Sequence, residues 1–337
     1  MSFLSGFGLK TEVCGLDMGP SILRMAQLKY PKQHAPLVAT SEVVMPKRLF
    51  DKNTITDIDG LSNALQTLID TGAPHHFSAK AVVAALPETY IFTRIVQVPH
   101  LAPSDLKKAL AYEIGQYLPV PIEEVYYDYT PLALHKEKRV IDIAIFAAPR
   151  SLVDPLIEII HSRGLELYAL ETKATAVVRS LMPSGAHSAA LIVEIGNEAT
   201  RLTIVDHGDV WLTTSLTCGE EQILKSIATS TNHAPKDIRQ FIGDGESKEM
   251  KSALKSALAP IIQEVASVTR YHSTRDYNPT VLNRTILVGQ AAGISGLIQA
   301  MSESLQKACE IGTPLIGNVP NLDLKYTVAI GLAMRPL

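Results

Sequence analysis

The chain has 337 residues and a mass of 36.6 kDa, which is enough for two domains of ordinary size. It is 46% hydrophobic and 19% charged, so it can bury large cores and is not a disordered tail. Lys and Arg number 31 against 34 Asp and Glu, which gives a net charge of −3. This balance excludes nucleic-acid binding driven by bulk positive charge.

The cysteines and the hydropathy pattern indicate a cytosolic protein. Cys14, Cys218 and Cys309 are scattered along the chain, so they form neither a disulfide framework nor a zinc-binding spacing. The first residues show none of the basic start, apolar stretch and cleavage site of a secretory signal peptide. No apolar run approaches the roughly 18 residues of a membrane-spanning helix. We therefore expect reduced thiols in a cytoplasmic chain.

In the first half of the chain, strand and helix patterns alternate, which is typical of an α/β fold. Strands are expected over 12–28, 37–44, 80–86, 90–98, 124–132, 139–147 and 165–171. Helices are expected over 58–71, 104–117 (with Ser104 as its cap) and 151–163. The stretch 80–163 is predicted to form a compact β-β-α-β-β-α unit inserted into the first half.

The pattern breaks around 182–187, where Pro183, Ser184 and Gly185 indicate a linker between two halves. Strands are expected after it over 190–196, 200–206, 209–216 and 285–289. Helices are expected over 219–231, 235–242, 247–276 and 294–308, and a segment over 323–334 closes the chain.

The openings of the two halves superimpose when the numbering is shifted by 177. CGLDMGPSILRMAQL (14–28) then lies over LIVEIGNEATRLTIV (191–205), and Asp17 meets Glu194. In each copy an apolar strand ends in an acidic residue, one residue is skipped, and a glycine begins the return into a second strand. Two such hairpins facing each other across a cleft would direct carboxylates and turn amides at one ligand.

Phosphate with Mg²⁺ suits this chemistry, because turn amides cradle phosphate oxygens and carboxylates hold the metal directly or through its waters. The alternative is that acid-x-Gly marks two ordinary hairpin turns. The occurrence of two copies, each at the first strand of its half, favours the functional interpretation.

At these residues the sequence resembles the actin-like ATPase superfamily of duplicated nucleotide-binding domains. Within it the chain is similar to the PilM-type proteins of type IV pilus assembly, which are relatives of FtsA. The phosphate segments are GLDMGPS (15–21) and LIVEIGNEATRLTIVDHG (191–208), and the adenosine segment is ILVGQAAGISGLIQAMSESL (286–305). Further matching stretches lie at 86–132, 147–181 and 323–335, so the resemblance covers nearly the whole chain.

The resemblance implies an α/β fold: a duplicated actin-like, ribonuclease H-like nucleotide-binding fold with an inserted α+β subdomain. Its expected parts are the first half of actin-like domain 1 (1–80), the inserted subdomain (81–163), the return to domain 1 with the linker (164–185), actin-like domain 2 (186–318) and a closing segment (319–337).

The resemblance also implies a site for ATP or ADP with Mg²⁺. The residues expected to bind the cofactor are Asp17, Gly19, Ser21, Glu194, Gly196, Thr200, Gly219, Gly289 and Gly293, and those expected to hold the metal are Asp17 and Glu194. Gly219 would place a helix N-terminus near the nucleotide, where the dipole favours anions. No residue is assigned a catalytic role.

Several residues depart from the superfamily pattern. Glu194 stands where Asp is usual, which puts its carboxylate one methylene further out. Asn197, Glu198 and Ala199 replace glycines and a threonine, and Glu198 would bring negative charge towards phosphates. Gln290 and Ala291 stand where glycines would let the backbone approach adenosine closely. We expect hydrolysis to be slow at most.

Five of the eleven tyrosines fall within 112–129. They either pack a half-buried strand or form a peptide groove, because Tyr combines a large apolar area with a hydrogen-bonding tip. The resemblance implies that Tyr112, Tyr126, Tyr127 and Tyr129 bind the cytoplasmic N-terminal peptide of a PilN-type membrane protein. The chain would then be a peripheral scaffold at the inner face of the cytoplasmic membrane, held there through partners, with further pilus motor components and self-association as additional possibilities.

Two other functions are weighed. A filament-forming FtsA-like or MreB-like protein shares the superfamily, but the given sequence stops at Arg335-Pro336-Leu337, with the last matching segment, and shows no basic amphipathic tail. A small-molecule kinase of the same superfamily needs an acidic base and a substrate pocket, for which the sequence shows no motif. A P-loop is excluded, because no G-x-x-x-x-G-K-[ST] run occurs.

Overall fold

The computed structural model describes residues 12–51, 54–118, 120–135, 137–186, 188–233, 238, 248–274 and 280–336. The chain divides into two compact units, one formed by residues 1–176 and 332–337 and the other by residues 177–331. The chain crosses from one unit to the other twice, each time within a helix: first in α4 (Lys173–Leu181) and then in α9 (Thr327–Ala333). The break thus precedes the expected linker at 182–187. None of the described helices is long and apolar enough to cross a membrane.

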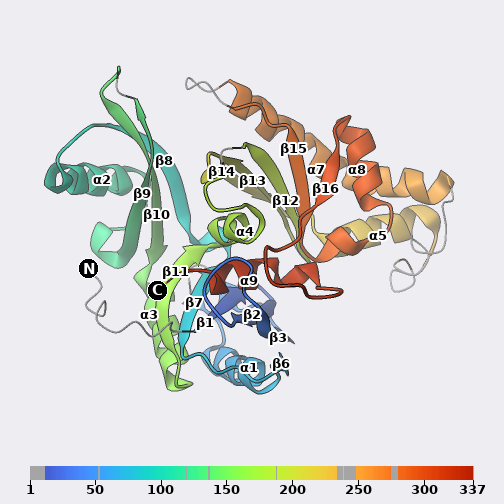
Figure 1. Cartoon of the computed structure of the whole chain (residues 1–337), viewed down its shortest axis with the longest axis horizontal. Helices are drawn as coiled ribbons and strands as arrows, with labels where there is room; N and C mark the ends of the chain where they lie inside the picture. Colours follow the sequence, from blue (N-terminus) through green and yellow to red (C-terminus); the bar gives the residue numbers. More distant parts are fainter. Residues whose placement is uncertain are drawn as a thin grey trace. The chain divides into compact units, whose positions relative to one another are not determined.

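The main sheet of the first unit has six strands in the order β11-β7-β1-β2-β3-β6 (Figure 1). The strands are β1 (Val13–Met18), β2 (Ile22–Leu28), β3 (Leu37–Val44), β6 (Ala73–Pro74), β7 (Ala81–Leu86) and β11 (Glu166–Thr172). β7 and β1 are buried along their whole length, as their continuous apolar sequences require, and β1, β7 and β11 run parallel. A small pair, β4 (Phe50–Asp51) and β5 (Thr54–Ile55), lies outside this sheet.

Helices α1 (Ile58–Asp70) and α3 (Arg150–Ser162) supply one side of the core of this unit. Their buried leucines and isoleucines recur at helical spacing and pack against the inward residues of β1, β2 and β7. Asp57 caps α1 by accepting a hydrogen bond from the Gly60 amide at 2.7 Å. The predicted helices over 58–71 and 151–163 are confirmed.

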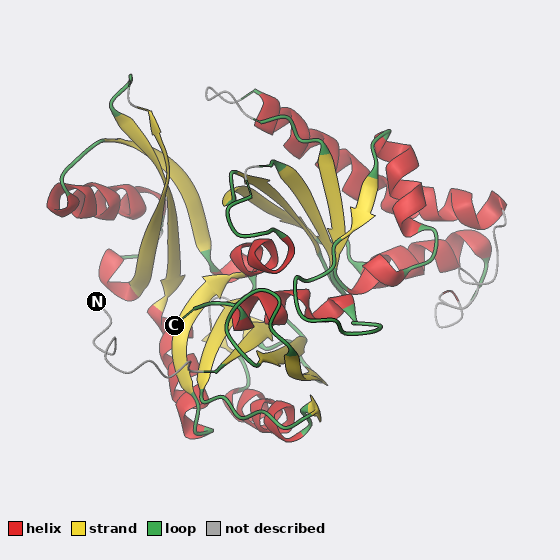
Figure 2. Cartoon of the chain, viewed as in Figure 1, coloured by secondary structure: helices red, strands yellow, loops and turns green. Residues whose placement is uncertain are grey.

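The second unit contains a five-stranded sheet in the order β14-β13-β12-β15-β16. The strands are β12 (Ala190–Ile195), β13 (Thr200–Asp206), β14 (Asp209–Leu216), β15 (Arg284–Val288) and β16 (Cys309–Ile311). Helices α5 (Glu220–Thr231), α7 (Lys248–Ser273) and α8 (Leu297–Leu305) pack beside the sheet (Figure 2). The helix predicted over 235–242 lies outside the described residues, apart from Ile238.

The two sheets have the same topology. The order β3-β2-β1-β7-β11 of the first corresponds to β14-β13-β12-β15-β16 of the second, with two antiparallel pairs followed by two parallel pairs in each. Even the register repeats, because Asp17 lies opposite Arg24 and Glu194 lies opposite Arg201. The shift of 177 residues seen in the sequence is therefore a structural duplication.

A separate three-stranded antiparallel sheet interrupts the first unit. It has the order β8-β10-β9 and comprises β8 (Phe92–Pro99), β9 (Val125–His135) and β10 (Val140–Pro149), with α2 (Pro103–Tyr117) packed on one face. The predicted insertion of 81–163 was too long at both ends. β7 pairs with β1, and α3 packs into the main core, so only the segment from β8 to β10 forms the subdomain.

Three details of the first half differ from the sequence-based expectation. The N-cap of α2 is Ala102, and Pro103 occupies the first helical turn, so Ser104 is not the cap. Helix α4, which is nearly all buried, was not predicted, although Ala174, Val177, Val178 and Leu181 recur at helical spacing. Strand β16 was missed too, since its three residues are too few to show a pattern.

Candidate functional site

The first hairpin is built around Gly19, between β1 and β2. The Gly19 amide donates to the Ile22 carbonyl at 2.8 Å, and a Cβ at position 19 would lie only 2.7 Å from that oxygen. The turn continues through Pro20 and Ser21, whose carbonyls accept the amides of Leu49 and Met45 at 2.8 Å each. The glycine is therefore needed for the turn itself, and its amide is already used within the turn.

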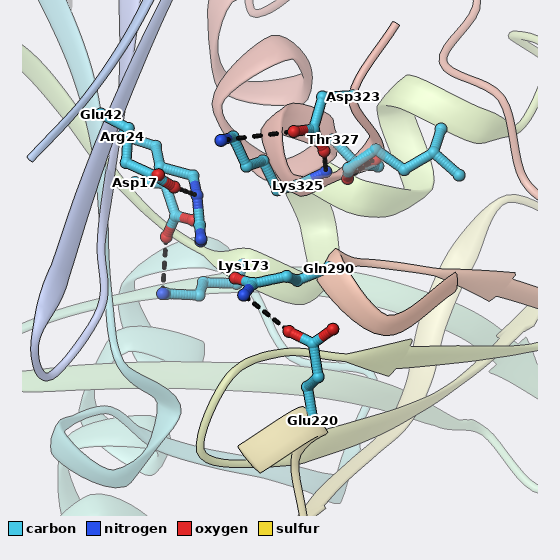
Figure 3. A network of polar contacts seen from close by, with 10 residues as sticks. Asp17, Arg24, Glu42, Lys173, Glu220, Gln290, Asp323, Lys325 and Thr327 are labelled. Atoms are coloured by element: carbon cyan, nitrogen blue, oxygen red, sulfur yellow. Dashed lines mark hydrogen bonds and ion pairs between the residues drawn. The ribbon is translucent and has the colours of Figure 1, made fainter. Parts of the chain in front are cut away.

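Asp17, the last acidic residue of β1 and an expected metal ligand, forms an ion pair within its own unit. Its Oδ1 lies 2.5 Å from Nζ of Lys173, the first residue of α4 (Figure 3). Both residues are buried, at 4% and 6% exposure. The sequence-based reasoning missed Lys173. The signal that could have found it is its position immediately after a predicted strand, where the parallel strands of an α/β sheet present their ligands.

Asp17 is also the first member of a charged row across three strands. Arg24 lies opposite it on β2, and Glu42 lies opposite Arg24 on β3. Arg24 Nε donates to Glu42 Oε2 at 2.6 Å, and both side chains are largely buried. Together with Lys173, the row contains two carboxylates and two cations, so its formal charges cancel.

The second hairpin repeats the geometry of the first. The Gly196 amide donates to the Ala199 carbonyl at 2.9 Å, which is the Gly19–Ile22 bond shifted by 177 residues. The acid and the arginine at the duplicated positions now pair directly, because Arg201 Nη1 donates to Glu194 Oε2. Thr200 is fully buried, and its hydroxyl donates to the Cys218 carbonyl at 2.5 Å.

Gly219 is the N-cap of α5, as expected, and it packs against the second hairpin. A Cβ there would lie 2.3 Å from the carbonyl oxygen of Asn197. The amides of Glu220 and Glu221, which open the helix, donate to the carbonyls of Gly196 and Asn197 at 2.8 and 3.1 Å. These two donors are therefore used by the hairpin, and both residues of the first turn are acidic. The use of these two amides and the two acidic side chains both disfavour an anion at this end of α5.

Glu220 is a second buried carboxylate that the sequence-based reasoning missed, although it follows Gly219 directly. It is 1% exposed, and its Oε2 accepts a hydrogen bond from Gln290 Nε2 at 2.7 Å (Figure 3). Gln290, which departs from the superfamily pattern, therefore satisfies a buried acid. It belongs to the short 3₁₀ turn after β15.

The two glycines expected at the adenosine segment differ in what they do. Gly289 has φ of +91°, and a Cβ there would lie 2.6 Å from the Ile195 carbonyl oxygen, so a glycine lets the end of β15 approach the end of β12. A Cβ at Gly293 would meet nothing within 4 Å. Gly293 thus has open space in front of it and no packing role.

The residues expected to hold Mg²⁺ do not fit that role. Asp17 is paired with Lys173 and Glu194 with Arg201, each within its own unit. Among the described residues, no group of three His, Cys, Asp or Glu side chains could hold a metal ion. Mg²⁺ prefers several free oxygen ligands, and each of these carboxylates is already neutralised.

The four tyrosines expected to bind a peptide do not share one face. Tyr127 and Tyr129 pack against the core of the small subdomain beneath α2. Tyr126 points to the opposite face of β9, and Tyr112 is 71% exposed on α2. They are thus two core residues and two separate exposed residues.

Tyr126 connects the small subdomain to α3. Its hydroxyl donates to Asp154 Oδ1 at 2.9 Å, and the Arg150 guanidinium lies 4.0 Å from the ring centroid. The hydrogen bond to Asp154 raises the pKa of the Tyr126 phenol. The side chain nevertheless remains 40% exposed.

Comparison with known proteins agrees with this fold. In the complex described as "PilM-PilN type IV pilus biogenesis complex", a chain superimposes with a TM-score of 0.79 at 21% identity, covering 97% of this chain and 99% of that one. The ethanolamine utilization protein EutJ of Carboxydothermus hydrogenoformans gives a TM-score of 0.56 at 14% identity, with coverage of 95% and 88%. MreB 5 of Spiroplasma citri bound to AMPPNP gives 0.51 at 14% identity, with coverage of 96% and 95%.

These structures confirm the actin-like fold. The sequence profile of the family described as "Type IV pilus assembly protein PilM" matches residues 15–337, from the middle of β1 to the last residue. The resemblance inferred from the hairpin motifs is confirmed, and this chain belongs to the PilM family of type IV pilus assembly proteins.

Proposed function

We propose that the chain is an adaptor of the type IV pilus assembly machinery that binds the cytoplasmic N-terminal segment of a PilN-type membrane protein. The observation that carries the proposal is its membership of the PilM family, together with its likeness over 97% of its length to a chain from a PilM–PilN complex. Binding such a segment would hold the chain at the inner face of the cytoplasmic membrane.

The small subdomain offers a suitable surface for an extended peptide. β9 lies at the edge of its sheet and, within the described residues, pairs with β10 alone. Such an edge can accept an additional strand through main-chain hydrogen bonds. Tyr126 lies on this strand with its ring exposed and its hydroxyl oriented by Asp154. We propose that the peptide lies along β9 and contacts Tyr126, while Tyr127 and Tyr129 hold the strand against α2.

The test is a titration of labelled peptides from the cytoplasmic start of the PilN-type protein of the same genome, followed by fluorescence anisotropy. Tyr126→Ala should weaken binding by about tenfold or more, as for a buried aromatic anchor. Tyr271→Ala is the matched control, because Tyr271 is equally aromatic, 53% exposed and in the other unit. Tyr112→Ala distinguishes the α2 surface from β9. A normal affinity for Tyr126→Ala with a loss for Tyr112→Ala would move the site to α2, and no binding at all would refute the adaptor.

A second proposed function is the binding of an adenine nucleotide, without Mg²⁺ held by Asp17 and Glu194. The duplicated fold favours it, since structures of MreB 5 with this fold are described as bound to ADP and to AMPPNP. The open space in front of Gly293 also favours it, because that glycine has no packing role of its own. Hydrolysis is expected to be slow, since both expected metal ligands are paired with cations.

Calorimetry with ATP and ADP, with and without Mg²⁺, tests this function. We expect binding that persists without Mg²⁺ and that weakens at least about tenfold in Gly293→Leu, whose side chain would enter the adenosine site. Gly115→Leu is the matched control, because a Cβ at Gly115 in α2 also meets nothing within 4 Å. Absence of heat from both nucleotides, or equal affinities in the two variants, would contradict the proposed site.

A further inference from the structure

The second unit contains a cavity of about 340 Å³ between the end of α7, the end of α8 and the sheet. Its walls come from α7, which contributes Ile262, Val265 and Arg270, and from the α8 end, which contributes Leu305 and Lys307. This volume lies at the small end of the range for sites that bind organic ligands.

The cavity is separate from the duplicated hairpins. Its floor is formed by Leu191 and Thr285, which are register partners at the amino ends of β12 and β15. Gly196 and Gly289 follow the carboxyl ends of the same two strands. Leu191 and Gly196 are therefore about 16 Å apart along the strand direction, at about 3.3 Å per residue. A ligand in the cavity would occupy neither of the hairpins.

The lining combines apolar side chains with two cations and with the hydroxyl residues Thr269, Ser273, Thr285 and Ser304. Leu191, Val265 and Leu282 are buried, and they leave a surface that favours a hydrocarbon chain over water. Arg270 and Lys307 are exposed, so their aliphatic stems border the cavity while their charges remain in solvent. Neither side chain forms an ion pair with another residue in the described part of the chain.

We infer that this cavity binds an amphipathic anion: a hydrocarbon chain of medium length that ends in a carboxylate or a phosphate. The chain would displace water from Leu191, Val265 and Leu282, so the affinity would rise with the number of methylenes that become buried. The anionic end would meet the Arg270 fork, which matches carboxylate and phosphate geometry, and the Lys307 ammonium. The free amphiphile and a membrane lipid share this chemistry.

The experiment uses the full chain with methyl-labelled Leu, Val and Ile, titrated with decanoate and with decyl phosphate below their micellar concentrations. We expect saturable shifts at the methyl groups of Leu191, Val265 and Leu282. Decanol, which has the chain but no charge, should bind at least about tenfold more weakly, because it makes no charge-assisted hydrogen bond to Arg270 or Lys307.

Two variants and one control test the apolar walls and the two cations separately. Ala266→Leu fills the cavity from an exposed position of α7 and should abolish binding, whereas Ala259→Leu, exposed on the same helix but outside the lining, should not. Arg270→Gln combined with Lys307→Gln should weaken decanoate at least about tenfold and leave decanol unchanged. Both alanines are exposed helical positions, at which Leu is tolerated.

The outcomes discriminate clearly. Three results would overturn the inference: methyl shifts that do not saturate up to millimolar ligand, shifts outside the cavity, or an unchanged affinity in Ala266→Leu. If decanol bound with the same affinity as decanoate, the role of the cations would be overturned. Binding to phosphatidylglycerol vesicles that is lost in Ala266→Leu would identify the ligand as a lipid, whereas binding of decanoate alone would identify a free amphiphile. Either result supports the shared chemistry.

Discussion

The buried ion pair between Asp17 and Lys173 makes the sharpest prediction about the first hairpin. Asp17→Asn keeps the shape of the side chain but leaves the Lys173 ammonium, which is 6% exposed, without its partner. Lys173→Met keeps most of the stem and removes the lysine partner of the Asp17 carboxylate. In both cases a charge stays in a site from which water is largely excluded.

The magnitude follows from that burial. Breaking a buried ion pair by removing one partner costs about 3–5 kcal/mol of unfolding free energy, whereas removing both charges together is often nearly neutral. We therefore expect each single variant to lose about 3–5 kcal/mol and the double variant Asp17→Asn/Lys173→Met to recover most of it. The non-additivity is the signature of direct contact.

Urea unfolding followed by circular dichroism measures these differences. The matched control is Lys255→Met, because Lys255 and Glu303 lie 2.6 Å apart but are each 47% exposed. That exposed pair should contribute no more than about 1 kcal/mol. Two results would refute the reasoning: single variants that lose no more stability than Lys255→Met, or a double variant whose loss equals the sum of the two single losses. Asp17 would then again be a candidate metal ligand.

Four further predictions concern single residues. Gly219→Ala should cost about 1–3 kcal/mol or more in urea unfolding, because its Cβ would lie 2.3 Å from the backbone oxygen of Asn197; a loss below that range would contradict the packing. Gly115→Ala, in open space within α2, should instead gain about 0.5–1 kcal/mol by the same measurement. Burial, with a smaller contribution from a nearby carboxylate, raises the pKa of the Cys14 thiol to about 12, so native Cys14 should resist alkylation at pH 8 while partly exposed Cys309 reacts, as mass spectrometry can show. The raised pKa also predicts how stability depends on pH. Above about pH 9 the unfolded chain loses the Cys14 proton while the native chain keeps it, so the free energy of unfolding should fall by up to about 1.4 kcal/mol per pH unit. Cys14→Ala should remove this contribution to the slope.

Much of the fold could be predicted from local pattern. The strands of both hairpins and helices α1 and α3 agree with their expected positions to within a few residues, because each has a complete hydrophobic period and a turn or a cap beside it. The duplication was visible for a similar reason. An acid, a skipped residue and a glycine recur at one fixed shift, and a hairpin turn needs that glycine at a particular position.

The extent of the insertion could not be predicted in the same way. Strand β7 has the same apolar sequence whether it pairs with β1 or with β8, and helix α3 has one apolar stripe that would fit either core. Which partner each element takes is a non-local choice, settled by the parallel ladder to β1 and by packing against α1. Adjacency along the chain suggested the small subdomain, and that inference was wrong.

The sequence by itself determined the two-part α/β architecture, the duplicated hairpins and the family, since each depends on residues close together in the chain. Only the tertiary structure decided what the charged residues of the hairpins contact. Asp17 and Glu194 occupy equivalent positions, yet one pairs with a lysine at the start of α4 and the other with the arginine opposite it. The physical reason is that a carboxylate removed from water must find a cation within a few ångströms, and that cation can come from any part of the chain that folding brings near.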